Sequence, residues 1–159
     1  MNYNYFVIAR IFHVLAVVLW IGGVGFVTTV LIPSIRKTEE PSARLKIFEA
    51  LESKFGFQAK LTTLVAGISG LYMLEVTDGW SRYLNSEFWW LHLMTFVWAV
   101  FTMVLFVLEP LFLHKWFHRQ AEKNSVKAFQ LLQTMHVVLL SLSILALVGA
   151  IAGSHGFTF

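Results

Sequence analysis

The chain of 159 residues contains no cysteine, and only 13% of its residues are charged. Without cysteine there is no disulfide framework, no thiolate metal site and no thiol nucleophile. Soluble domains carry about 25% charged residues and about 45–50% apolar residues, whereas apolar residues here make up 57%. This composition excludes a disordered chain and argues against a soluble globular protein. The length fits a single domain over residues 1–159.

Four long apolar stretches cover residues 6–32, 57–76, 88–110 and 129–153. A helix rises about 1.5 Å per residue, so about 20 residues cross the hydrocarbon core of a bilayer. The second stretch is the weakest, because Lys60 and Glu75 at its ends must both reach the interfaces. The sequence therefore predicts an all-α fold, an integral membrane four-helix bundle in one transmembrane domain. The first stretch is too long for a signal peptide core, so we expect it to be retained.

The positions of the basic residues predict the orientation of the chain. Ten of the twelve Lys and Arg residues fall within residues 33–60 and 115–127. Loops rich in Lys and Arg stay in the cytoplasm. We therefore expect a multi-pass protein of the bacterial inner (cytoplasmic) membrane with its N-terminus and C-terminus outside. The same placement favours the lipid bilayer, and not nucleic acid, as the partner of this basic chain.

Residues 42–55 are predicted to form a short amphipathic cytoplasmic helix between the first two spans. Its apolar residues recur at helical spacing with charged residues between them: Leu45, Phe48, Leu51 and Phe55. We expect this helix to lie on the membrane surface and to lead into the second span. At the inner end of the third span, Glu109 is expected to pair with the basic loop, with proton relay as the alternative.

The histidines are the main candidates for chemistry, because an ionisable residue inside a span is costly and marks function. At about 1.5 Å per residue, His13 and His92 lie about 9 Å and about 10 Å to the outer side of their span centres. Two imidazoles at one depth on separate helices can hold a haem iron from both faces. Arg10 lies one turn outward from His13 and suits a haem propionate. Trp20 lies on the same face.

His136 lies about 6 Å to the cytoplasmic side of the centre of the fourth span. It is either a hydrogen-bonded core histidine or a ligand of a second haem, with His114, Lys60 or an open position opposite. Hydrogen bonding between helices is also the structural alternative for His13 and His92. The glycines of the first two spans either pack helices together or admit a flat macrocycle: Gly22, Gly23, Gly25, Gly67 and Gly70.

Copper is the competing metal, because methionine thioethers are soft ligands. Met135 stands next to His136, but neighbouring residues on a helix point about 100° apart and do not chelate together. The chain also has no cluster of Met and His in an outer loop that would capture copper. A phosphate-binding loop, a serine nucleophile motif and an HExxH motif are absent from the sequence.

The run Arg10-Ile-Phe-His13, followed by Trp20-Ile-Gly-Gly23 and Leu31-Ile-Pro33, resembles the first helix of the CopD-like (copper resistance protein D-like) membrane proteins. The related HemJ-type protoporphyrinogen oxidases share this layout, and Trp89-Trp90-Leu91-His92 resembles the start of helix three in the same group. The resemblance implies a four-helix membrane bundle with b-type haem and with His13 and His92 as its key positions. HemJ-type enzymes have a Lys two residues after the helix-three histidine, where this chain has Met94.

The leading hypothesis is a haem b-binding membrane protein that transfers electrons, with one or two haems as cofactors and His13, His92 and His136 as candidate iron ligands. A quinone or a periplasmic redox protein would be its partner. The alternatives are a HemJ-type protoporphyrinogen oxidase, a CopD-like copper transport or resistance protein, and a structural subunit of a respiratory complex. The sequence leaves open whether the chain is an enzyme and whether it forms a homo-oligomer.

Overall fold

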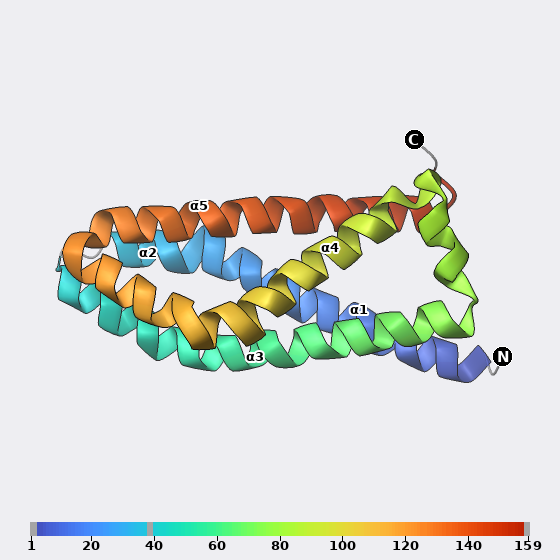
Figure 1. The fold of residues 1–159 in the computed structure, drawn as a ribbon, viewed down its shortest axis with the longest axis horizontal. Helices are drawn as coiled ribbons and strands as arrows, with labels where there is room; N and C mark the ends of the chain where they lie inside the picture. The colour runs from blue at the N-terminus through green and yellow to red at the C-terminus, as the bar shows by residue number, and fades with distance from the viewer. Residues whose placement is uncertain (1–2, 38–39, 158–159) are drawn as a thin grey trace.

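The computed structural model describes residues 3–37 and 40–157, without the side chains of Pro41, Ser42, Glu52, Ser53 and His114. The described residues form helices joined by short turns, and none of them is in a strand. Four of the helical stretches are long and apolar enough to cross a membrane, which confirms the prediction of an all-α chain with four such helices. They run side by side along an elongated molecule (Figure 1).

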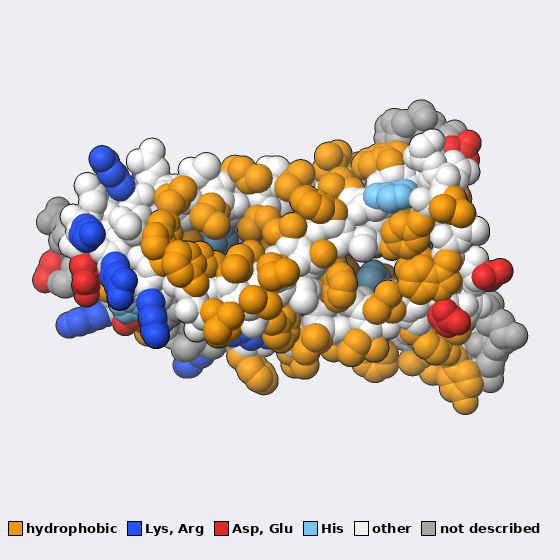
Figure 2. Space-filling model, viewed as in Figure 1, with side chains coloured by type: hydrophobic (Ala, Val, Ile, Leu, Met, Phe, Trp, Pro, Cys, Tyr) orange, Lys and Arg blue, Asp and Glu red, His pale blue; other side chains and the backbone are white. Residues whose placement is uncertain are grey.

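The first and last described residues, Tyr3 and Phe157, lie at one end of the molecule, which we call the terminal end (Figure 1). Lys and Arg side chains gather at the opposite end, which we call the basic end (Figure 2). Apolar side chains cover the surface between the two ends, and many are largely exposed, such as Phe57 and Ile68. A helix bundle that folds in water would carry polar residues on that surface.

The first pass is longer than the predicted span and runs from α1 (Tyr3–Phe26) through η1 (Val27–Leu31) into α2 (Ile32–Arg36). The η1 segment is a π-helix, a wide turn that holds one extra residue. Pro33 is the second residue after it and has no backbone N–H to donate to the preceding turn. The wide turn therefore lies where the regular hydrogen-bond ladder is already interrupted.

The second pass is one helix, α3 (Pro41–Val76), so the prediction of a separate amphipathic helix at residues 42–55 is wrong. Phe48, on the predicted apolar face of this segment, is only 7% exposed and faces the interior of the bundle. The Phe48 ring packs against Phe117 and Phe129, with ring centroids 5.2 and 5.7 Å apart. Gly56 lies in the middle of α3 without ending the helix, at a cost of about 1 kcal/mol relative to alanine.

Two short 3-10 helices, η2 (Gly79–Leu84) and η3 (Ser86–Phe88), connect the second and third passes at the terminal end. The third pass consists of α4 (Trp89–Met103) and the π-helix η4 (Val104–Leu113), which contains Pro110. The chain continues directly into α5 (His114–Ser154). Within α5 only Asn124 departs from helical geometry (φ −156°, ψ 87°), and there the chain reverses into the fourth pass.

The α4 helix crosses from one neighbour to another along its length (Figure 1). At the terminal end, Trp89 and Trp90 lie against Gly149 and Gly153 of α5. Two turns further on, the Trp98 indole donates a hydrogen bond to the Thr63 carbonyl of α3 (3.0 Å). The α1–α3 pair and the α4–α5 pair therefore diverge toward the terminal end.

The glycines of α1 and α3 serve helix packing where side chains lie against them. A Cβ atom at Gly67 would come within 2.5 Å of Trp98, and one at Gly23 within 2.5 Å of Phe55. Either contact would force the neighbouring ring to move, so glycine allows the close approach of the helices. A Cβ at Gly22 would meet nothing within 4 Å. The packing interpretation is thus confirmed for Gly23 and Gly67.

Candidate functional site

His13 of α1 is partly buried against α3, and its hydrogen bonding defines which nitrogen is available. Its Nδ1 lies 2.9 Å from the Ala66 carbonyl oxygen and 3.2 Å from the Ser69 hydroxyl. A carbonyl only accepts, so Nδ1 carries the proton and the lone pair lies on Nε2. A Cβ atom at Gly70 would come within 3.2 Å of His13 Cε1, so the glycine leaves room for the ring.

His92 of α4 is exposed and faces the connection between the second and third passes. Its Nδ1 lies 3.2 Å from the Phe88 carbonyl, and its Nε2 lies 3.1 Å from the Tyr83 carbonyl. A neutral imidazole has only one N–H, so the two carbonyls compete for it. Tyr83 also packs its ring edge against His92, with centroids 5.2 Å apart, and its hydroxyl is hydrogen-bonded to Thr95 (2.6 Å).

His13 and His92 lie at similar heights along the bundle. The rings of Trp20 on α1 and Phe101 on α4 meet edge to face, with centroids 4.9 Å apart, and the two helices run in the same direction. His13 precedes Trp20 by seven residues and His92 precedes Phe101 by nine, which places them about 10 Å and about 14 Å from this contact toward the terminal end. No hydrogen bond joins the two histidines within the described part of the chain.

Arg10 and Trp20 stand on either side of His13 along α1. Arg10 is exposed one turn closer to the terminal end. Trp20 is 5% exposed and belongs to the core cluster that also contains Ala16, Val24 and Phe101. Its indole nitrogen is buried and has no hydrogen-bond partner among the described residues. On the face of α1 that carries His13, Arg10 is therefore a surface residue and Trp20 is a core residue.

His136 of α5 is partly buried toward the basic half of the bundle. Its Nδ1 lies 2.9 Å from the Leu132 carbonyl of the preceding turn, which leaves the lone pair on Nε2, as in His13. The neighbouring Gln133 donates to the Thr28 carbonyl of the first pass (2.8 Å). Of the ligands considered opposite His136, the side chain of His114 lies outside the described residues. Lys60 has a different partner.

Lys60 of α3 forms an ion pair with Glu109 of η4. The Glu109 carboxylate lies 3.1 Å from the Lys60 ammonium. The two side chains remain 33% and 26% exposed, so the pair lies at the edge of the bundle interior. Glu109 was expected to pair with the basic loop, and the structure shows its partner on α3 instead. The two residues therefore tie the second pass to the third, inside two of the four apolar helices.

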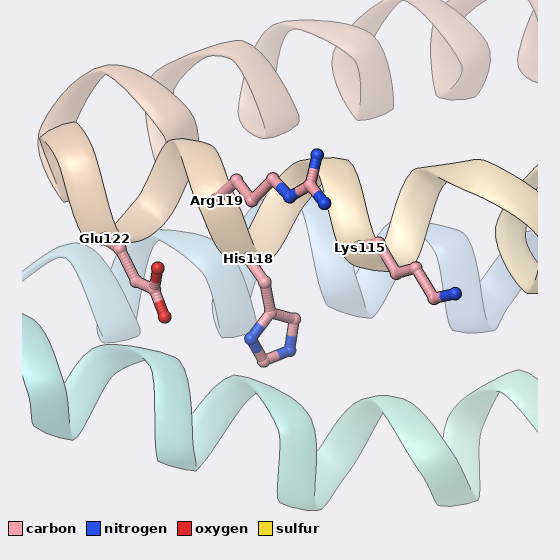
Figure 3. A pocket seen from close by; sticks show the side chains of 4 residues that line it. All are labelled: Lys115, His118, Arg119 and Glu122. Carbon is pink, nitrogen blue, oxygen red and sulfur yellow. The ribbon is translucent and has the colours of Figure 1, made fainter.

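A second cluster of charged groups surrounds a surface pocket of about 350 Å³ at the basic end. Four side chains from the first part of α5 line it: Lys115, His118, Arg119 and Glu122 (Figure 3). His118 and Glu122 point toward α3 in this view. His118 Nε2 lies 2.6 Å from the Glu49 carboxylate, so this contact joins α5 to the early part of α3.

Sequence reasoning missed three features of these regions. The Lys60–Glu109 and His118–Glu49 pairs depend on the register between passes, and Ser69 and Ala66 at His13 depend on how α1 and α3 face each other. No three His, Asp or Glu side chains within residues 3–37 and 40–157 converge as around a bare metal ion. Comparisons with protein-family models, with curated proteins and with solved structures found no match to this chain.

Proposed function

We propose that the chain is a haem b-binding protein of the bacterial inner membrane that takes part in electron transfer. The observation that carries this proposal is the state of His13. Its Nδ1–H is engaged by α3, and its Nε2 lone pair has no partner among the described residues. A histidine that ligates a metal through one ring nitrogen almost always donates its other N–H to a carbonyl or a similar acceptor.

The membrane part of the proposal rests on the surface of the bundle. Four helices have the length and the hydropathy of membrane spans, and apolar side chains cover the surface between the two ends (Figure 2). Basic residues gather at one end only, which we assign to the cytoplasm by the positive-inside rule. Both termini are then outside, on the side to which His13 and Arg10 are closest.

The residues present fit a haem at the terminal half of the bundle. His13 and His92 would be the axial ligands, because residue counting places them at similar heights, on helix pairs that diverge toward the terminal end (Figure 1). His92 would have to give up its contact with the Tyr83 carbonyl. Arg10 would pair with a propionate, since a cation at the interface suits that carboxylate. Haem b supplies a one-electron couple there, and a quinone or a periplasmic redox protein would exchange the electron.

The test is a reduced-minus-oxidised absorbance spectrum of the chain purified from haem-supplied cells, together with a haem-to-protein ratio. We expect b-type bands in the native chain and their loss in His13→Ala and in His92→Ala. His155→Ala is the matched control, because His155 is exposed at the terminal end and bonds only within its own turn region. Native chain without b-type bands, or variants at positions 13 and 92 that keep all their haem, would contradict the proposal.

The same preparation separates the other candidate functions. Elemental analysis that finds copper and no iron would favour copper handling. Complementation of a strain that lacks protoporphyrinogen oxidation would favour the HemJ-type activity. The spectrum of His136→Ala distinguishes one haem from two: a fall to half the haem content indicates a second haem at His136, and an unchanged content indicates a core histidine.

A further inference from the structure

Three buried polar atoms without a partner lie in the middle of the bundle, on three different passes. They are the indole nitrogen of Trp20 on α1 and the hydroxyls of Thr63 on α3 and Thr102 on α4. Thr63 is fully buried, with 0% of its surface exposed. None of the three atoms has a hydrogen-bond partner within the described part of the chain.

The three residues share one level of the bundle. Trp20 packs against Phe101, the residue before Thr102. Trp98 lies one turn from Thr102 on the same face of α4 and donates to the carbonyl of Thr63. These contacts of α4 with α1 and with α3 therefore place Thr102 at about the same height along the bundle as Trp20 and Thr63.

Several other buried hydroxyls donate to the carbonyl four residues earlier, including those of Thr28, Ser143 and Thr62, the immediate neighbour of Thr63. Among the described residues, the buried hydroxyl of Ser125 also has no hydrogen-bond partner. A buried polar group that makes no hydrogen bond costs about 1–3 kcal/mol. Three such groups at one level therefore call for a ligand that both donates and accepts hydrogen bonds, and water has this chemistry.

A polar path leads from this level toward the basic end. Lys60 precedes Thr63 by three residues, which places both on one face of α3 about 4.5 Å apart along the axis. Glu109 follows Thr102 by about two turns and pairs with Lys60. Both charged side chains are partly exposed, so the pair lies at the surface end of this polar path.

We propose that Trp20, Thr63 and Thr102 enclose an internal water site and that the Lys60–Glu109 pair forms its entrance from the basic end. The middle of the bundle is then hydrated from one side only. Neither of the proposed axial ligands, His13 and His92, contributes to the site, and Trp20 is the one residue that it shares with the predicted haem face.

Single-cysteine variants test the proposal directly, because the native chain has no cysteine background. Thr63→Cys and Thr102→Cys are made in full-length chain in vesicles, and a small charged thiosulfonate that does not cross membranes is added to either face. Thr62→Cys is the matched control, since its position is also buried but its hydroxyl is satisfied. Leu84→Cys marks the terminal side, because this residue is 92% exposed.

We expect cysteines at positions 63 and 102 to react at least about tenfold faster than the cysteine at 62, because a thiol away from water stays protonated and inert. The reagent must act from the face opposite to that which labels position 84. Equal, slow labelling at 62, 63 and 102 would overturn the open entrance, and the water site itself is tested by the measurement described next. Labelling of 63 and 102 only from the face of position 84 would overturn the entrance.

A measurement on the unsubstituted chain covers the case in which a variant misfolds. In a spectrum of the ¹⁵N-labelled indoles, the Trp20 N–H should exchange magnetisation with water. The Trp98 N–H is an internal reference, because it donates to the Thr63 carbonyl. Transfer from water at Trp98 but not at Trp20 would contradict the proposal.

Discussion

The two halves of the bundle are held together in different ways. In the basic half, Phe129 and Ile32 are completely buried in an apolar cluster, and charged pairs join α3 to η4 and to α5. In the terminal half, α4 leaves α3 for α5, and histidine and serine side chains lie among the helices. The comparison teaches that both halves have an apolar cluster, and that charged pairs join the helices in the basic half whereas His13 and its hydrogen bonds join α1 to α3 in the terminal half.

The largest effect is expected at Phe129, whose replacement breaks the basic-half cluster. Phe129→Ala should lower the free energy of unfolding by about 3–5 kcal/mol, the usual cost of a large cavity in a core. Reversible unfolding in mixed micelles measures this change. Phe112→Ala is the control, because Phe112 is 57% exposed and its loss leaves no cavity. Equal losses at the two positions would show that the cluster is not the stabilising element.

Gly67 tests the helix contact at which the two halves meet. Gly67→Ala should destabilise the fold by about 1–3 kcal/mol, because the added methyl group overlaps the Trp98 ring. Gly22→Ala should be neutral or slightly stabilising, because its methyl group meets open space and alanine favours a helix. Unfolding of the two variants under the same conditions gives the difference. A more stable Gly67→Ala variant would mean that α3 and α4 lie further apart than described.

The Lys60–Glu109 pair tests how much a charged contact between α3 and η4 contributes to the stability of the basic half. Lys60→Met should cost about 1–2 kcal/mol, because Glu109 loses its partner while partial exposure to water limits the penalty. The double variant Lys60→Met/Glu109→Leu should recover most of that loss, since no unpaired charge remains. A double-mutant cycle measures the coupling between the two side chains. Strictly additive losses would show that the two charges do not interact.

The smallest effect on stability is expected at Ser69, in the terminal half. Ser69→Ala should lower the free energy of unfolding by about 0.5–1.5 kcal/mol, the net value of one hydrogen bond. Haem affinity should fall about 10–100-fold, because outer partners orient a ligating histidine. Titration of the haem-free variant with haem measures this change, and Ser143→Ala is the control. Unchanged haem affinity at position 69 would argue that Ser69 does not orient His13.

Hydropathy predicted four apolar helical passes, because each pass is a long apolar run that needs no knowledge of its neighbours. It did not predict that α3 is continuous from Pro41 to Val76. The pattern around Phe48 shows an apolar face, and only the fold shows that this face meets Phe117 and Phe129 and not lipid. The sequence also did not show that the turn between the third and fourth passes is made at one residue, Asn124, because the polar residues around it suit a helix or a loop equally well.

The candidate site was predictable only in part. Counting residues along the helices gave similar heights for His13 and His92, since the rise per residue is constant. The direction of each ring depends on the rotation of its helix and on the turns nearby. His92 meets the Tyr83 carbonyl because η2 folds back over the start of α4. Whether these histidines bind haem stays a prediction until the spectrum is measured.

The π-helix η4 gives the third pass a tolerance in its own length. A π-helix holds extra residues relative to an α-helix of the same span. A deletion of one residue between Val104 and Leu108 would therefore be absorbed by a return to α-helical geometry, and Glu109 would keep its direction toward Lys60. Relatives of this chain should tolerate single-residue deletions in η4 as well as in the connection at Gly79–Leu84.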